Sequence, residues 1–118
     1  MRTLILLLSL LLGCNMMNAQ SDYYMRQAKN HQREAAYYTK QAQRYDRDVD
    51  YYNRQAKGYL RDAEYNLKRE KYNQAKRYQC MAKDATEKAE SYKRKADDAR
   101  EKARSYMLKA EKALKSVR

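Results

Sequence analysis

Alanine and tyrosine recur every seven residues along this chain, and that spacing leaves few folds open. The small residues of the first half are Ala28, Ala35, Ala42, Val49, Ala56 and Ala63. The aromatic residues between them are Tyr24, His31, Tyr38, Tyr45, Tyr52 and Tyr59. Together they form a heptad with the small residue at position a and the aromatic residue at position d. We therefore expect long coiled-coil α-helices that pack through a seam of alanine and tyrosine.

The second half repeats the heptad in a different phase. Its a positions are Ala75, Ala82, Ala89, Ala96, Ala103, Ala110 and Val117, and its d positions alternate tyrosine with alanine from Tyr78 to Ala113. Ala63 and Ala75 are 12 residues apart, whereas two intact heptads need 14. One straight seam would be rotated at this point, but two arms joined by a turn need not share a phase. The slip predicts a turn or register break near residues 66–73.

Charges beside the seam favour an antiparallel arrangement. The g positions are neutral or acidic in the first half and mostly lysine in the second. Two antiparallel arms would bring Glu34 near Lys109 and Asp48 near Lys95, while Tyr52 would face Ala89. We therefore predict an all-α antiparallel two-helix hairpin. A continuous helix, a parallel oligomer and a bundle of more helices are the alternatives.

The first residues carry an export signal. Arg2 is followed by a run of mostly leucine from Leu4 to Leu12, which is too short to span a bilayer. Residues 1–19 are thus predicted to be a signal peptide and residues 20–118 the helical domain. The segment 11–14 resembles the lipobox of bacterial lipoproteins, which implies lipidation of Cys14, although Leu12 departs from that motif. Cleavage after Ala19 is the alternative.

The two cleavage sites imply different locations for the exported protein. Lipidation of Cys14 implies an outer-membrane or periplasmic lipoprotein that contacts the membrane through its lipid anchor alone. Cleavage after Ala19 implies a secreted or periplasmic protein.

An excess of basic residues points to an anionic partner. The chain has 27 basic and 15 acidic residues, and removal of Arg2 with the signal would lower the net charge from +12 to +11. The f positions of the first half are all basic: Arg26, Arg33, Lys40, Arg47, Arg54 and Arg61. Position c carries Tyr23, Tyr37, Tyr51 and Tyr65. These ten residues are our candidates for binding an anionic surface, unless the basic row is simply solvated and the tyrosines widen a thin seam.

The sequence has few residues in arrangements suited to catalysis or metal binding, so we expect no enzymatic activity, metal site or cofactor. His31, the single histidine, falls on the aromatic row of the seam. Asp46, Asp48 and Asp50 would scatter around a helix instead of converging on a metal. Cys80 falls at position f of the second half, where we expect an exposed free thiol.

These observations predict an exported, non-enzymatic scaffolding protein of the cell envelope. Its signal and alanine seam resemble, in general style, the small alanine-rich lipoproteins of bacterial outer membranes. The expected partners are the protein itself, another helical protein or an anionic envelope polymer. One alternative is a binding module for nucleic acid or acidic polysaccharide. Another is a helical-repeat adaptor of the tetratricopeptide kind, suggested by residues 72–75 with Tyr78 and Ala82.

Overall fold

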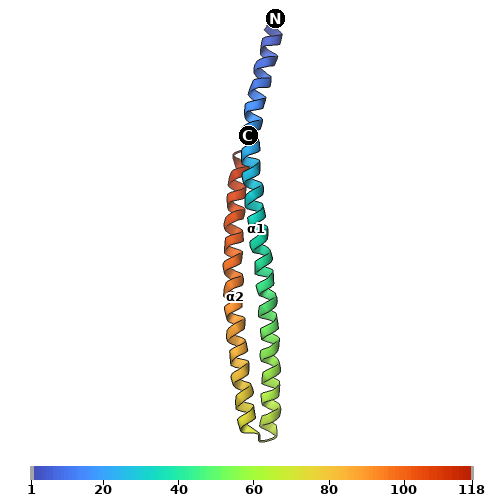
Figure 1. Cartoon of the computed structure of the whole chain (residues 1–118), viewed down its shortest axis with the longest axis vertical. Helices are drawn as coiled ribbons and strands as arrows, with labels where there is room; N and C mark the ends of the chain where they lie inside the picture. The colour runs from blue at the N-terminus through green and yellow to red at the C-terminus, as the bar shows by residue number, and fades with distance from the viewer. Residues whose placement is uncertain (1, 118) are drawn as a thin grey trace. The chain divides into compact units, whose positions relative to one another are not determined.

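Two long helices make up the part of the chain that the structure describes. The computed structural model describes the backbone of residues 2–117 and the side chains of residues 19–117. Helix α1 spans Arg2–Lys68 and helix α2 spans Tyr72–Lys115 (Figure 1). The prediction of an all-α antiparallel hairpin is confirmed. Lipidation of Cys14 and most of the predicted signal peptide lie outside the described side chains.

Both helices follow from the composition of the chain. Alanine, lysine, arginine, glutamine and glutamate are strong helix formers, and the sequence contains no proline. Gly58, inside α1, leaves the helix unbroken. Neither helix contains, in the part that the structure describes, a stretch long and apolar enough to cross a membrane.

The chain reverses at residues 69–71, inside the segment where the heptad slips. The amide of Glu70 donates to the carbonyl of Leu67 (3.1 Å), and the amide of Lys71 donates to the carbonyl of Asn66 (2.9 Å). This pair of bonds is a Schellman motif, which satisfies carbonyls at the end of α1. Glu70 takes the left-handed conformation that the motif requires, with φ of 58°. The turn therefore forms without glycine.

The molecule divides into two compact units, each containing part of both helices. The turn unit comprises residues 38–101, and the terminal unit comprises residues 1–37 with 102–118. In each unit α1 packs antiparallel to α2. Alanine forms the core, and every core alanine is at most 8% exposed. The buried alanines are Ala28, Ala35, Ala42, Ala56 and Ala63 in α1, and Ala75, Ala82, Ala85, Ala89, Ala96, Ala99, Ala103 and Ala110 in α2.

Tyrosines at position d are half-buried and meet across the seam. In the turn unit the Tyr92 ring stacks on Tyr52 (centroids 5.6 Å apart, planes 8° apart) and also contacts Tyr45 (6.1 Å). Tyr59 stacks on Tyr78 at 6.4 Å. Tyr92 thus lies between two rings of α1, the place that the predicted register gives it. In the terminal unit, His31 packs on Tyr106 (6.1 Å), so the histidine is a seam residue as expected.

The predicted ion pairs beside the seam are not formed. Neither Glu34 with Lys109 nor Asp48 with Lys95 is among the ion pairs of the described residues. The ammonium groups lie over aromatic rings instead, Lys109 at 4.8 Å from the Tyr106 centroid and Lys95 at 5.0 Å from that of Tyr92. A lysine three residues after a tyrosine reaches that ring on its own helix, and this short-range contact replaces the charge pairing that we expected.

Candidate functional site

The basic row of α1 faces solvent in both units. All six f-position residues are exposed, because a heptad that buries a and d turns f to the opposite side of the helix. In the turn unit, Arg54 pairs with Asp50 at 2.9 Å, with both side chains more than 60% exposed. Such a pair contributes about 0–1 kcal/mol and gives way easily to another anion. The other five make no ion pair among the described residues.

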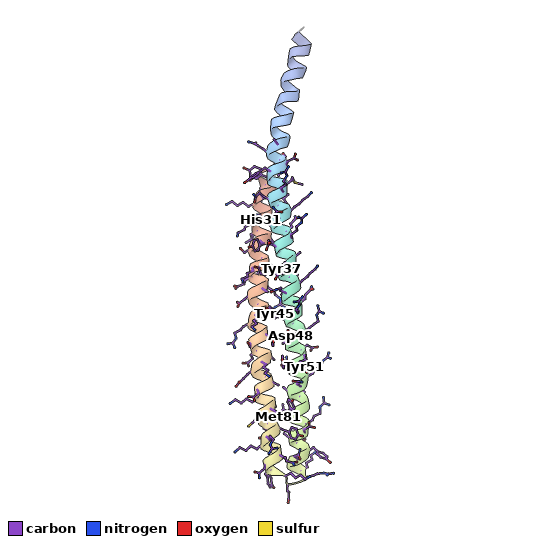
Figure 2. All side chains as sticks on the ribbon, in the orientation of Figure 1. His31, Tyr37, Tyr45, Asp48, Tyr51 and Met81 are labelled. Carbon is purple, nitrogen blue, oxygen red and sulfur yellow. The ribbon has the colours of Figure 1, made fainter. Side chains whose placement is uncertain are left out.

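Four tyrosines at position c lie beside this row and are also exposed. Their exposed fractions are 58% for Tyr23, 54% for Tyr37, 55% for Tyr51 and 54% for Tyr65. Side chains radiate from both helices in Figure 2, where Tyr37 and Tyr51 are labelled. Two of them, Tyr23 and Tyr51, also contact seam tyrosines of α1, so a ring at position c can both widen the seam and present a face to solvent.

Local contacts orient three of these rings. Tyr51 packs edge-on against Tyr52 (5.1 Å), and its hydroxyl accepts a hydrogen bond of 2.7 Å from Nε2 of Gln55. Tyr23 makes a similar edge contact with Tyr24 at 5.3 Å. The guanidinium of Arg69 lies 4.5 Å from the Tyr65 ring centroid. A ring held in this way loses less conformational entropy when a ligand stacks on its open face.

We define the α1 outer face by the ten residues of the f and c rows, divided between the two units. The turn unit holds Lys40, Arg47, Arg54 and Arg61 with Tyr51 and Tyr65, and the terminal unit holds Arg26 and Arg33 with Tyr23 and Tyr37. Successive f residues rise about 10.5 Å along the helix. Each unit therefore offers regularly spaced cations beside aromatic rings, a surface suited to a repeating anion.

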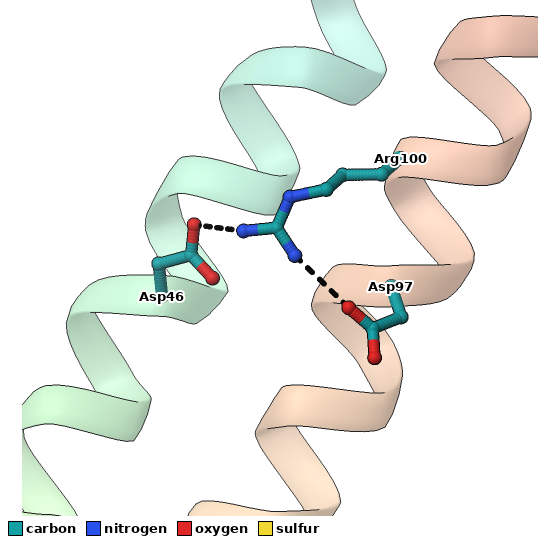
Figure 3. Close-up of polar contacts among 3 residues, drawn as sticks. All are labelled: Asp46, Asp97 and Arg100. Atoms are coloured by element: carbon teal, nitrogen blue, oxygen red, sulfur yellow. Dashed lines mark hydrogen bonds and ion pairs between the residues drawn. The ribbon is translucent and has the colours of Figure 1, made fainter.

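One ion pair crosses the seam of the turn unit, and the charge pattern at g did not predict it. The guanidinium of Arg100 on α2 donates hydrogen bonds to the carboxylates of Asp46 on α1 and Asp97 on α2, the latter at 3.1 Å (Figure 3). The hydrogen bond with Asp46 is the main reason that the pKa of Arg100 is raised. Both Asp46 and Arg100 occupy position e, on the other side of the seam from g. The signal that could have found the pair is opposite charge at the e positions of the two helices.

Cys80 is an exposed free thiol, as its f position suggests. Within the described residues, no three His, Cys, Asp or Glu side chains gather as a metal site would require. Asp46 is instead engaged by Arg100. The prediction that this protein is not an enzyme remains a prediction.

The comparisons with known proteins add no relative. No protein-family model, no curated protein and no solved structure matches the chain.

Proposed function

We propose that the protein is an exported, non-catalytic scaffold of the cell envelope that holds an acidic polysaccharide on its α1 outer face. The observation that carries this proposal is the exposure of all six basic f residues together with four tyrosines that are more than half exposed. The seam of α1 is already covered by α2. The six basic residues at f and the four tyrosines at c are therefore left facing solvent.

The two residue types suit different parts of one polymer. Arginine and lysine form charge-assisted hydrogen bonds to carboxylates or sulfates. An open tyrosine ring offers an apolar face with a polar hydroxyl at its edge, on which a sugar ring can lie. Nucleic acid is the competing anion, since bases also stack on tyrosine. The first 19 residues predict export, and for an exported protein we favour polysaccharide over nucleic acid as the bound polymer.

Chromatography on immobilised heparin, a sulfated polysaccharide, tests the surface. The variant Arg47→Gln/Arg54→Gln/Arg61→Gln should elute at clearly lower salt than the wild type, because binding through several cations falls steeply with salt. A matched control, Arg77→Gln/Lys83→Gln/Arg94→Gln, removes the same charge from exposed residues of α2 in the same unit. This control should elute at nearly the same salt concentration as the wild type. Equal loss in both variants would show that only net charge matters, and the proposed surface would be rejected.

Two further measurements define the polymer and the location. Displacement of the bound protein by polygalacturonate but not by single-stranded DNA supports the polysaccharide, and the reverse would make the protein a nucleic-acid binder. Mass spectrometry of the exported protein distinguishes a lipid on Cys14 from cleavage after Ala19. Discovery of an intact, uncleaved N-terminus in the cytoplasm would contradict the envelope location.

A further inference from the structure

A shallow groove that is open to solvent, called the terminal cavity below, lies between the helices of the terminal unit and includes Tyr24 and His31 of the seam. It has a volume of about 300 Å³, and α1 supplies Tyr23, Tyr24, Gln27 and His31 to its lining. From α2 come Lys109, Lys112, Ala113 and Ser116. The cavity forms because a methyl group, Ala113, occupies a d position that holds tyrosine in alternate heptads of α2. Tyr23 also belongs to the α1 outer face, but the proposed function assigns no role to the other lining residues.

The lining contains two lysines and no acidic side chain, and most of its exposed area is apolar. The polar residues of the lining are two lysines, two tyrosines, a glutamine, a histidine and a serine, and neither aspartate nor glutamate is among them. Three cavities of the turn unit each contain at least one acid: Asp84 in one, Glu70 in another, and Glu87 with Glu90 in the third. An anion entering the terminal cavity therefore meets cations that no lining acid neutralises.

Neighbouring contacts hold the lining groups in place. Tyr23 and Tyr24 pack edge to face, with centroids 5.3 Å apart and planes at 75°, so they form two walls at nearly a right angle. Lys109 is held with its ammonium group over the Tyr106 ring. The Ser116 hydroxyl donates to the carbonyl of Lys112 (3.2 Å), which leaves its oxygen lone pairs as acceptors. Lys112 makes no ion pair among the described residues.

We infer that this cavity binds a single sugar-acid unit, a pyranose ring that carries one carboxylate. The carboxylate accepts a charge-assisted hydrogen bond from Lys112, and Lys109, whose ammonium group lies over the Tyr106 ring, adds positive charge nearby. The sugar ring packs on the Tyr24 wall, and the sugar hydroxyls meet Gln27, Ser116 and the phenol oxygens. This inference rests on the proposed function and deepens it, because it names the class of unit that the polysaccharide contains.

Equilibrium dialysis of the purified protein against radiolabelled glucuronate tests the inference. Glucuronate should bind measurably more tightly than glucose, which lacks the charge, and than acetate, which lacks the ring. Lys112→Ala should weaken glucuronate binding about tenfold, the loss expected for one hydrogen bond between charged groups. The matched control Lys115→Ala removes an exposed lysine of the same helix end that does not line the cavity, and its affinity should equal that of the wild type.

Loss of the ring contact gives a second, independent measurement. Tyr24→Leu keeps an apolar residue in the seam and removes the aromatic wall, so it should weaken glucuronate binding while acetate binding stays unchanged. Circular dichroism verifies that both variants remain helical. Adenosine monophosphate that binds as tightly as glucuronate would overturn the assignment to a sugar acid, and so would equal affinities for glucuronate and acetate.

Failure here is separable from failure of the proposed function. If glucuronate does not bind while heparin retention still depends on Arg47, Arg54 and Arg61, the cavity inference is wrong and the polymer surface stands. If Lys112→Ala weakens glucuronate binding while the α1 triple variant and its α2 control elute from heparin at the same salt concentration, the cavity is a saccharide site. The α1 outer face is then not a polysaccharide-binding surface.

Discussion

Glu70 is the residue at which the chain reverses, and its backbone is costly for an L-amino acid. A left-handed conformation costs roughly 1–2 kcal/mol for residues with a side chain, which is why glycine usually occupies this place in a Schellman motif. A carboxylate at the C-terminal end of α1 also opposes the helix dipole. The turn forms because the hairpin seam and the two capping hydrogen bonds outweigh these costs.

Glu70→Gly should therefore stabilise the protein by about 1 kcal/mol, since glycine removes the steric cost and the charge but gains freedom in the unfolded chain. Urea unfolding followed by circular dichroism measures this. Glu70→Ala is the matched control, because it removes the charge and keeps the Cβ atom. The glycine variant should exceed the alanine variant in stability, and the opposite order would mean that φ at this residue is not the cause.

Gly58 offers the reverse substitution in the middle of α1. A Cβ atom built there would meet nothing within 4 Å, and the residue has an ordinary helical φ. Gly58→Ala should raise the free energy of unfolding by about 0.5–1 kcal/mol, because alanine has the higher helix propensity. Urea unfolding is again the measurement, and a decrease would show that the neighbouring seam cannot accept a methyl group.

Tyrosine has two different uses within the same helices, depending on its heptad position. At d the rings stack across the seam, whereas at c they stay more than half exposed. A seam of alanines alone buries little area, on the order of 0.8 kcal/mol for each methyl. The stacked rings therefore contribute much of the stability that holds α1 against α2.

Replacing Tyr92 by alanine tests whether the stacked d-position rings contribute more stability than the exposed c-position rings. Tyr92 contacts both Tyr45 and Tyr52, so Tyr92→Ala should lower the free energy of unfolding by about 2 kcal/mol, somewhat less than for a fully buried ring. Tyr65→Ala makes the same chemical change at an exposed c position and should alter stability by less than about 0.5 kcal/mol. Similar losses from both substitutions would contradict a stacked seam.

The heptad predicted most of the buried residues but not how the charged side chains are arranged. Val49, at position a, is only partly buried, and the buried Asn66 was not expected. Small residues at a and aromatic residues at d require a second helix to cover the seam, and the phase slip between Ala63 and Ala75 marks the turn. The contact of Lys88 with the Tyr52 ring (5.5 Å) depends on side-chain rotamers and on the exact stagger of the helices. So does the pairing of Asp46 with Arg100. A repeat pattern specifies neither, because long side chains reach several neighbours from one position.

At the scale of the whole molecule, α1 and α2 of one chain cover each other's seam. Thermal unfolding of such a hairpin is intramolecular, so its midpoint should not change when the protein concentration rises 100-fold. Circular dichroism melts at two concentrations measure this. A midpoint that rises with concentration would show that a second chain supplies part of the core, as in the parallel oligomer that the sequence left open.

Net charge sets how the whole molecule responds to salt. The chain carries 27 basic and 15 acidic residues, its core is made of alanine and tyrosine, and a single ion pair links the two helices within the described residues. Salt therefore screens more repulsion than attraction. We expect the unfolding midpoint to rise as sodium chloride increases from about 0.01 M to about 0.15 M, over which the Debye length falls from about 30 Å to about 8 Å.

A variant with fewer charges separates this effect from other actions of salt. Arg47→Gln/Arg54→Gln/Arg61→Gln lowers the net charge of the chain from +12 to +9, so its midpoint should rise less over the same range. Sodium chloride is preferable to sulfate, which strengthens apolar burial by itself. A midpoint that falls with salt in the wild type would mean that the exposed ion pairs stabilise the hairpin more than the like charges destabilise it. The basic face would then be part of the fold's own electrostatics, and its exposure would no longer argue for an anionic partner.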